Sequence, residues 1–371
     1  MGIMMLQSGL LTTIQDAGRR GYQRYGMGVS GAVDVHAYIY ANILVGNRQN
    51  EAVLEVTLLG PKIEFTSNSV IAVTGGDLSP TLDGIPLPMY RAVRVTKGSI
   101  LSFGPPKTGC RAYIAFAGGL AITPIMGSRS TYIKANLGGY EGRRLLAGDE
   151  IAFRRPSSCP ANVERRIMEP DTFGGEYTVR VLMGPQDDSF TDRGIETFLS
   201  ETYTVTNEFD RMGYRLTGPK IEHVTDGNII TDGIAFGAIQ VPDGGEPIIM
   251  LADRQTTGGY AKIASIINVD MPMIAQCKAG DRIRFIETDI ETAQKAFRDQ
   301  RAKYRAMRES FDAPQQQSAP EQPTKAPASA AVSPVPVSQP AEKSPASGTG
   351  PHNYRIILGT KTYDVTVEAV K

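Results

Sequence analysis

The chain has 371 residues, of which 41% are hydrophobic and 21% are charged, as in typical globular proteins. Lys and Arg together number 39, and so do Asp and Glu, so the charge balance does not indicate a nucleic-acid partner. No apolar run approaches the roughly 20 residues that span a bilayer, and the N-terminus lacks the features of a signal peptide. The three cysteines, Cys110, Cys159 and Cys277, are too few and too widely spaced for a disulfide framework. We therefore expect a cytoplasmic protein with no membrane or nucleic-acid partner.

The N-terminal segment GLLTTIQDAGRRGYQRYGMGVSGAVD, residues 9–34, contains six glycines, three arginines and two aspartates. Glycine inside a regular element costs roughly 0.5–1 kcal/mol relative to alanine, so this composition predicts a loop that approaches a ligand or a partner closely. The next residues, VHAYIYANILV at 35–45, predict a helix with Asp34 as its N-cap. Asn42 near the end of this helix is a candidate site residue, whereas Asn47 has the simpler interpretation of a left-handed cap.

Short β-branched and aromatic runs, such as VIAVTGG and RAYIAFAGG, predict strands through most of the chain. Their close spacing favours antiparallel sandwiches or barrels over a doubly wound sheet. Two sequence matches recur in the same order: GPKIE at 60–64 and 218–222, and AGD at 147–149 and 279–281. They predict two related β-domains in which the GPKIE segments are equivalent. A cleft between the domains is then the first place to look for function.

A second polar stretch, DRQTTGGY at 253–260, follows the predicted strand PIIMLA. Its hydrogen-bonding side chains and its glycine pair are typical of a loop that holds a small polar ligand, because glycine lets backbone amides come close and Arg254 can fork onto a carboxylate or carbonyl. A hairpin loop with a surface Asp/Arg pair is the alternative. Gln240, among apolar strand residues, needs buried partners. The histidines, His36, His223 and His352, lack zinc-binding spacing, so we expect no metal site.

The C-terminal part changes in composition. One apolar face in ETDIETAQKAFRDQRAKYRAMRESF predicts an amphipathic helix, and a stretch rich in Pro, Ala and Ser follows that has almost nothing to bury. The prediction is therefore a mainly β protein in five segments: a first β-domain (1–160), a second β-domain (170–290), a helix (291–311), a disordered linker (312–351) and a tail (352–371).

The family resemblance rests on six segments in a fixed order: TTIQDAGRRGYQRYGMGVSGAVD, ANILVGN, LEVTLLGPKIEF, RMGYRLTGP, GAIQVPDGGEPIIMLADRQTTGGYAKIASII and AGDRIRF. Over roughly residues 6–290 the chain resembles the biotin-dependent carboxyltransferase family, also called allophanate hydrolase subunit 2 or KipA-like. The resemblance implies two cyclophilin-like β-barrel domains. The tail NYRIILGTKTYDVTVEAVK resembles the opening strands of a biotin carrier domain, but it lacks the AMKM segment whose lysine would carry biotin.

The function that the resemblance implies is a subunit of a heteromeric ATP-dependent enzyme acting on an amide or urea-like molecule. It is either of the type of the 5-oxoprolinase C subunit or a biotin-dependent carboxyltransferase, and is inactive without its partner. The implied partner is a KipI-like (allophanate hydrolase subunit 1) protein, with a biotin carboxylase and biotin carrier, or a LamB/YcsF-type subunit, as further components. The implied cofactor is carboxybiotin from a separate carrier, or ATP bound by the complex. A KipA-like regulatory module that binds a KipI-like kinase inhibitor, and a scaffold with a decayed site, remain alternatives.

The candidate site combines the two polar stretches in one cleft. For catalysis we expect Asp253 or Tyr260 to transfer a proton, and Arg254 to stabilise an anion with the backbone amides of Gly258 and Gly259. The expected substrate-binding residues are polar side chains or glycines of the same motifs: Asp16, Arg19, Ser30, Asp34, Asn42, Gln240, Gln255, Thr256, Thr257, Gly258, Gly259 and Lys262.

Overall fold

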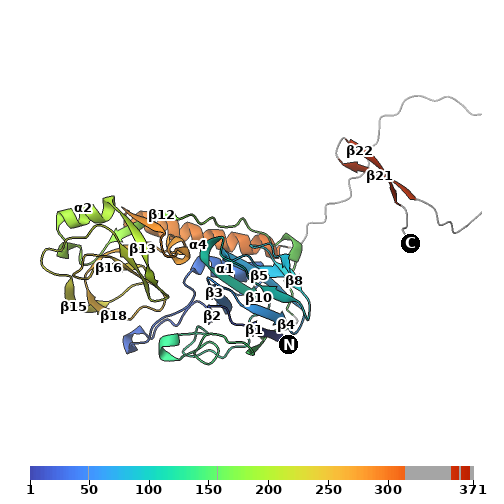
Figure 1. Ribbon diagram of the computed structural model, residues 1–371, viewed down its shortest axis with the longest axis horizontal. Coiled ribbons are helices and arrows are strands. Elements are labelled where there is room, and N and C mark those ends of the chain that lie inside the picture. Colours follow the sequence, from blue (N-terminus) through green and yellow to red (C-terminus); the bar gives the residue numbers. More distant parts are fainter. Residues whose placement is uncertain (49, 157, 314–351, 359–360, 368–371) are drawn as a thin grey trace, which may run out of the picture. The chain divides into compact units, whose positions relative to one another are not determined.

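A computed structural model of the chain describes residues 1–48, 50–156, 158–313, 352–358 and 361–367. The chain divides into two units, Met1–Gln315 and Gln316–Lys371, which are described separately. The first unit is mainly β, with one lobe that contains strands β1 to β11 and a second lobe that contains strands β12 to β20 (Figure 1). The mainly β prediction is therefore confirmed, while most of the expected linker, residues 314–351, lies outside the described residues.

The first lobe consists of two sheets. One sheet has the strand order β11 (Glu150–Ala152), β1 (Gly2–Gln7), β4 (Lys62–Phe65), β9 (Ile100–Ser102), β6 (Thr81–Leu82) and β7 (Ile85–Pro86). The other has the order β2 (Leu11–Gln15), β3 (Val53–Thr57), β10 (Thr108–Phe116), β5 (Ser69–Asp77) and β8 (Val93–Val95). Apolar residues of both sheets form one hydrophobic cluster, so the sheets pack face to face.

Helix α1 (Val35–Leu44) covers the opposite face of the five-stranded sheet. The two-residue period of the strands explains this arrangement. In β10, Ile114 faces the other sheet, while its neighbours Tyr113 and Ala115 join the cluster around α1. The predicted N-cap is confirmed, because Asp34 Oδ1 accepts a hydrogen bond from the backbone N–H of Ala37 at 2.9 Å.

The second lobe is a closed barrel of seven strands, in the order β12 (Glu176–Met183), β19 (Lys262–Ile266), β16 (Ala238–Gln240), β17 (Ile248–Met250), β14 (Gly213–Thr217), β13 (Thr202–Phe209) and β20 (Arg282–Glu287). The last strand in sequence, β20, closes the barrel by pairing in parallel with the first, β12. Inside, Phe198 stacks on Phe285 with 4.6 Å between the ring centroids. The lobe also contains α2 (Asp192–Ser200), α3 (Met271–Gln276) and a ribbon of β15 (Asn228–Gly233) and β18 (Thr257–Tyr260).

The two AGD segments form the same turn in the two lobes. Asp149 and Asp281 each accept a hydrogen bond from the backbone N–H three residues earlier, at 2.7 and 3.0 Å. The glycine before each aspartate has a positive φ, 91° at Gly148 and 89° at Gly280, which favours glycine over other residues. The backbone carbonyl of each aspartate accepts a hydrogen bond from the neighbouring strand, β1 or β13.

The GPKIE segments, in contrast, are not equivalent, and this prediction is wrong. The AGD turns bond to Met5 on β1 and to Val205 on β13, which makes these two residues equivalent. Met5 pairs with Ile63, but Val205 pairs with Leu216, five positions before the isoleucine of the second GPKIE. The first segment therefore continues into β4, whereas residues 218–222 follow β14 and lie outside any strand. The two similar sequences therefore have different secondary structure.

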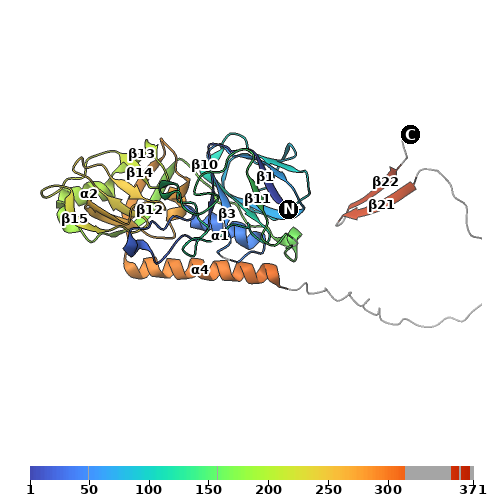
Figure 2. The same cartoon turned by 90° about the horizontal axis from the view of Figure 1, so that it is seen from below.

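Helix α4 (Ile290–Asp312) follows the barrel and runs along both lobes (Figure 2). The helix was expected at 291–311 with a continuous apolar face. Its second half meets this expectation, since Tyr304 is buried and Met307 packs beside the α1 cluster. The first half does not, because Ile290 and Phe297 are 54% and 43% exposed. Short 3₁₀ turns lie at Gln23–Tyr25, Ile133–Ala135, Val163–Arg165 and Asp187–Ser189.

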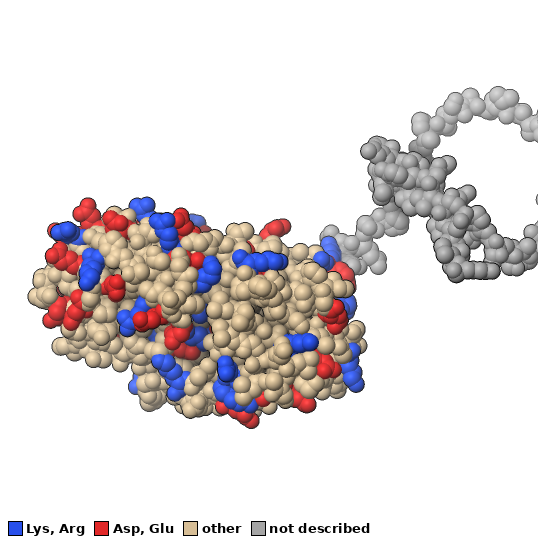
Figure 3. Space-filling view, in the orientation of Figure 1, with Lys and Arg blue, Asp and Glu red and all other residues tan. Residues whose placement is uncertain are grey.

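The second unit contains an antiparallel pair, β21 (His352–Leu358) and β22 (Lys361–Val367). No helix among the described residues has both the length and the apolar character to cross a membrane. On the visible face of the first unit, acidic and basic side chains are mixed (Figure 3).

Candidate functional site

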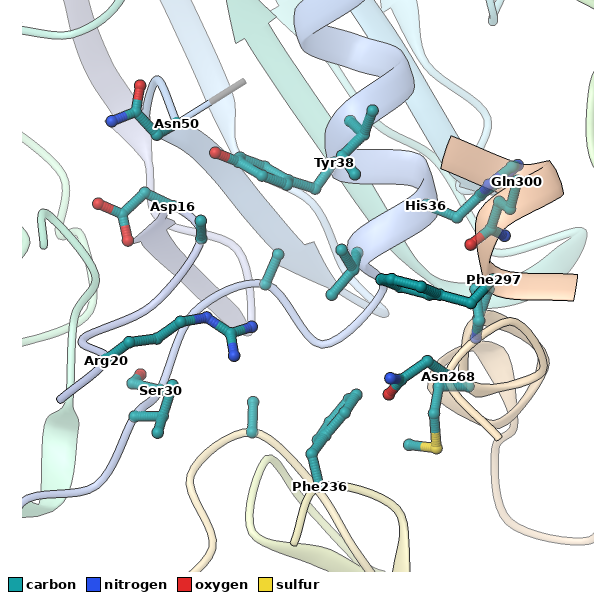
Figure 4. A pocket seen from close by; sticks show the side chains of 18 of the residues that line it. Asp16, Arg20, Ser30, His36, Tyr38, Asn50, Phe236, Asn268, Phe297 and Gln300 are labelled. Atoms are coloured by element: carbon teal, nitrogen blue, oxygen red, sulfur yellow. The ribbon is translucent and has the colours of Figure 1, made fainter. Parts of the chain in front are cut away.

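A cavity of about 640 Å³ lies where the two lobes meet helix α4 (Figure 4). Its lining comes from segments far apart in the sequence. They include the N-terminal loop, helix α1, three segments of the second lobe and helix α4, represented by Arg20, Ser30, His36, Phe236, Arg254, Asn268 and Tyr304. The cavity therefore forms only when both lobes and α4 are in place.

Arg254 gives this cavity a cationic wall. Its Nε donates to the carbonyl oxygen of Ile234 at 2.9 Å and its Nη1 to that of Leu251 at 3.0 Å. Among the described residues, no carboxylate forms an ion pair with Arg254 or with the exposed Arg20, which also lines the cavity. Burial, and then the charge of Arg20, lower the pKa of Arg254 to about 10, so it remains a cation at neutral pH. Figure 4 shows Arg20 reaching into the cavity.

Asp16 lines the cavity, but its carboxylate has several partners in the fold. Ser128 and Ser130 donate their hydroxyls to Oδ1 at 2.7 and 2.6 Å, and the backbone N–H of Gly18 donates to the same oxygen at 2.9 Å. The backbone N–H of Arg129 donates to Oδ2 at 2.6 Å. Asp16 therefore holds the glycine-rich N-terminal segment on a second loop of the first lobe.

Arg19 and Ser30 contribute to the same attachment. Arg19 is fully buried outside the cavity lining and donates to the carbonyl oxygens of Ile125 at 3.2 Å and Ser130 at 2.9 Å. Ser30 lines the cavity with a positive φ of 55°, and its hydroxyl donates to the carbonyl oxygen of Thr131 at 2.8 Å. The glycine-rich N-terminal segment, which we expected to approach a ligand closely, is thus held mainly by hydrogen bonds to other parts of the first lobe.

Asp253 lies in a buried ion-pair cluster beside the cavity. Arg211 donates to it from Nε to Oδ2 at 2.9 Å and from Nη2 to Oδ1 at 3.1 Å, and also pairs with Glu55 of the first lobe. Burial alone would lower the pKa of Arg211, but the charges of Asp253 and Glu55 raise it above its ordinary value. The carboxylate that we expected to transfer a proton is therefore paired within its own lobe with Arg211, which also pairs with Glu55 of the other lobe.

Asp34 and Asn42 lie within the first lobe, outside the cavity lining. Burial raises the pKa of Asp34 to about 6, against the opposing effect of His36. Asn42 donates from Nδ2 to the carbonyl oxygens of Tyr38 at 3.3 Å and Glu51 at 3.1 Å. Both side chains hold the ends of α1.

The rest of DRQTTGGY leads away from the cavity, because residues 257–260 form strand β18 of the ribbon. Tyr260 is 41% exposed there, and its carbonyl oxygen accepts from Gln240 Nε2 at 3.3 Å. Lys262 is buried and donates to Asp232 Oδ2 at 3.0 Å. Other expected site residues also lie outside the cavity lining: Gln255, Thr256, Thr257, Gly258 and Gly259. Of the expected cleft, the cavity brings together Asp16, Ser30 and Arg254.

Sequence reasoning missed several cavity residues. Arg20 follows Arg19 directly, so the RR pair marked the position without showing which arginine points inward. His36 was considered in the sequence only as a metal ligand and set aside, so its place in the cavity lining was missed. No sequence signal links it to Tyr304, whose hydroxyl lies 2.7 Å away and 268 positions later. Among the described residues, no group of three or more His, Cys, Asp or Glu side chains is arranged for a metal ion.

Comparisons with known proteins agree on one family. The family model described as "Carboxyltransferase domain, subdomain A and B" matches residues 25–287. The chain is 36% identical over 298 residues to the C subunit of Escherichia coli 5-oxoprolinase, covering 80% of this chain and 95% of that protein. It is 35% identical over 304 residues to urea amidolyase of Saccharomyces cerevisiae, covering 77% of this chain but 16% of that one.

A solved structure shows the same relationship. The Kluyveromyces lactis urea amidolyase superposes with a TM-score of 0.77 at 32% identity, over 82% of this chain and 20% of that chain. The chain thus spans a small part of the urea amidolyases and nearly the whole of the E. coli protein.

Proposed function

This chain belongs to the carboxyltransferase-domain family of subdomains A and B, and from that premise we propose that it is a subunit of a heteromeric ATP-dependent enzyme of the 5-oxoprolinase type. The length match supports this choice, because the chain covers 95% of the E. coli 5-oxoprolinase C subunit. The relatives named above are enzymes, which favours an enzymatic role over a regulatory module that binds a kinase inhibitor. A biotin-dependent carboxyltransferase acting on a urea-like molecule is the second candidate, favoured by the superposition on urea amidolyase.

The observation that carries the proposal is the cationic wall of the cavity. Arg254 is buried with two carbonyl partners and, in the part of the chain that the structure describes, no carboxylate partner, and Arg20 adds a second positive charge. A guanidinium in such a place binds a carboxylate strongly, since water competes little there. 5-Oxoproline is a small lactam with a carboxylate, whereas urea is uncharged. The apolar side chains of Phe236 and Phe297 line the same cavity and offer contact surface for the lactam ring.

The cofactor and partner assignments are part of the proposal. When bound, carboxybiotin would supply a carboxyl group and ATP the driving force, and Arg20 and Arg254 are the residues of this chain that suit an anionic group of either. We propose a KipI-like partner, and a LamB/YcsF-type subunit or a biotin carboxylase with its carrier in the same complex. We propose that the chain is cytoplasmic and inactive alone.

The finer domain assignments are proposals as well. We propose two related cyclophilin-like domains, 1–160 and 170–290, which the matching AGD turns support. We propose that the tail at 352–371 is biotinyl-domain-like, as its resemblance to the opening strands of a biotin carrier domain implies.

The test measures ligand binding and turnover by the complex reconstituted with its partner subunits. We expect 5-oxoproline to bind at least about tenfold more tightly than 2-pyrrolidinone, the same lactam without the carboxylate, and more tightly than urea. Arg254→Ala should abolish this preference when binding is measured below the variant's own melting temperature, which should fall because the carbonyl groups of Ile234 and Leu251 lose their donor. Arg254→Lys should restore it only in part, because lysine keeps the charge but loses the two-pronged geometry.

The matched control is Arg24→Ala, which removes an exposed arginine of the same N-terminal segment and should change neither property. Unchanged turnover in both Arg254 variants would remove Arg254 from the site. Equal binding of urea and 5-oxoproline would favour the second candidate function.

A further inference from the structure

A chain of three polar side chains leads from outside the cavity to its wall. We propose that Asp171, His36 and Tyr304 form a proton relay in which the Tyr304 hydroxyl is the group that meets the amide of the cavity ligand. The identity of that ligand rests on the proposed function, whereas the relay can be tested without it. Tyr304 is then a catalytic residue, and His36 and Asp171 are positioning residues that act through it.

The relay is defined by distances between residues of three separate segments. His36 on α1 lies with Nδ1 2.7 Å from the hydroxyl of Tyr304 on α4. Its Nε2 lies 3.5 Å from Oδ1 of Asp171, in the segment that joins the lobes. Tyr90 donates its hydroxyl to the other Asp171 oxygen at 3.0 Å. Both His36 and Tyr304 line the cavity, and Figure 4 shows His36 and Arg20 on different sides of it.

The protonation state of His36 decides what Tyr304 can offer to a ligand. In the neutral imidazole, Nε2–H points to Asp171, and Nδ1 accepts the hydroxyl proton of Tyr304. The Tyr304 oxygen can then only accept a hydrogen bond from the cavity. In the imidazolium, Nδ1–H donates to that oxygen, so the O–H of Tyr304 is free to donate to a ligand carbonyl.

A complete transfer balances without any further reactant. The O–H bond of Tyr304 breaks as its proton passes to a basic atom of the ligand, and a new O–H bond forms with the proton from Nδ1 of His36. The imidazolium becomes a neutral imidazole with its remaining proton on Nε2, beside Asp171. Tyr304 ends unchanged, and one proton has moved from His36 to the ligand.

The charge states of the two partners of His36 suit the relay. Burial acts to raise the pKa of Asp171, but the hydrogen bond and charge of His36 keep this pKa below its ordinary value. Asp171 is therefore a carboxylate at neutral pH. Burial raises the pKa of Tyr304, which keeps its proton. The groups near His36 and its two partners come from every packed element: Asp34 and Tyr40 on α1, Lys303 and Arg301 on α4, and Tyr90 beside Asp171.

The test uses NMR of the full chain, which has only three histidines, so His36 can be assigned by the signal that His36→Gln removes. Between pH 5 and 9 we expect Asp171→Asn to lower the measured pKa of His36 by about one unit, because it removes a neighbouring negative charge. Tyr304→Phe should shift the Nδ1 resonance at high pH. Addition of 2-pyrrolidinone, which lacks a carboxylate, should shift the His36 signals in the wild type but not in Tyr304→Phe.

The matched control is Glu164→Gln, which removes an exposed carboxylate and should leave His36 unchanged. A His36 that does not titrate in this range, or that ignores both Asp171→Asn and Tyr304→Phe, would overturn the relay. In the reconstituted complex, Tyr304→Phe should lower kcat about 100-fold and remove the pH dependence that follows the His36 pKa. Absence of any 5-oxoproline turnover in the wild type would count against the proposed function alone, because the NMR results judge the relay separately.

Discussion

Gln276 of the second lobe donates a hydrogen bond from Nε2 to Oδ2 of Asp34 in the first lobe, at 2.8 Å. The same amide also bonds to the backbone of β10. Its Nε2 donates to the carbonyl oxygen of Arg111 at 3.0 Å, and its Oε1 accepts from the backbone N–H groups of Cys110 and Arg111 at 3.1 and 3.0 Å. One buried side chain therefore joins α3 to both the N-cap of α1 and the central strand of the other lobe.

Replacing Gln276 should weaken the contact between the two lobes and lower the free energy of unfolding. Gln276→Met leaves several buried polar groups of the first lobe without a partner, and each such group costs about 1–3 kcal/mol. We expect the unfolding free energy to fall by about 3 kcal/mol, measured by urea denaturation. Gln294→Met, at an exposed position of α4, is the control and should change it by less than about 0.5 kcal/mol. Equal effects of the two substitutions would show that the interlobe amide contributes nothing.

Asp34 should make stability depend on pH. Burial raises its pKa from 3.8 to about 6, so between these values the folded chain binds the proton more tightly than the unfolded chain. Stability should therefore fall as pH rises from about 4 to 6, by on the order of 3 kcal/mol, and level off above that range. Asp34→Asn, which keeps an N-cap side chain, should remove this decline in urea midpoints measured from pH 4 to 7.

The N-cap of α4 supplies the control for Asp34. The backbone N–H of Thr292 lowers the pKa of the exposed Asp289, so its contribution is present at neutral pH and is lost as pH falls. Asp289→Asn should therefore leave the decline between pH 4 and 6 intact. A decline that persists in Asp34→Asn would assign it to other groups.

The ion pairs of Arg211 should matter far more than those at the surface. Arg211→Met leaves Asp253 and Glu55 buried without their cation, and such a loss costs about 3–5 kcal/mol. Arg215→Met, four residues later, breaks an exposed pair with Glu208 and should cost less than about 1 kcal/mol. Thermal unfolding of both variants decides the matter, and similar melting temperatures would contradict the prediction.

Gly138 tests the attachment of Arg19 to the loop beside the cavity. Its φ is +69°, and an added Cβ would lie 2.2 Å from the carbonyl oxygen of Ser130 and 2.6 Å from Nη2 of Arg19. Gly127 also has a positive φ, +76°, but open space around the added carbon. Gly138→Ala should therefore lose at least about 2 kcal/mol more stability than Gly127→Ala in urea unfolding. Equal losses would mean that only backbone strain matters.

Much of the fold could be predicted because local sequence determines it. Asp34 before an apolar run marks the start of α1, and the AGD turns require glycine at a positive φ. The GPKIE match failed because a short apolar-polar pattern suits many strands, and register depends on partners far along the chain. The exposed Phe297 was placed in an apolar face because helical period alone does not reveal a cavity.

The candidate site was harder to predict, since polar motifs serve the fold as often as the ligand. Asp253 was expected in the site because aspartate can transfer a proton, and in the fold its carboxylate accepts hydrogen bonds from Arg211. Arg254, its neighbour in sequence, faces the cavity instead. His36 and Tyr304 meet only through the docking of α4 on α1, which no local pattern encodes.

The pairing of β12 with β20 has a consequence for the order in which the protein forms during synthesis. A ribosome that has released β12 must extend the chain as far as Glu287 before the barrel has its closing strand. The first lobe has all its strands once Ala152 has emerged, so it can fold while the second is still incomplete. Helix α4 is made after the strands of both lobes, and it brings Tyr304 to His36. A nascent chain stalled before α4 would therefore hold two finished lobes and an unfinished cavity.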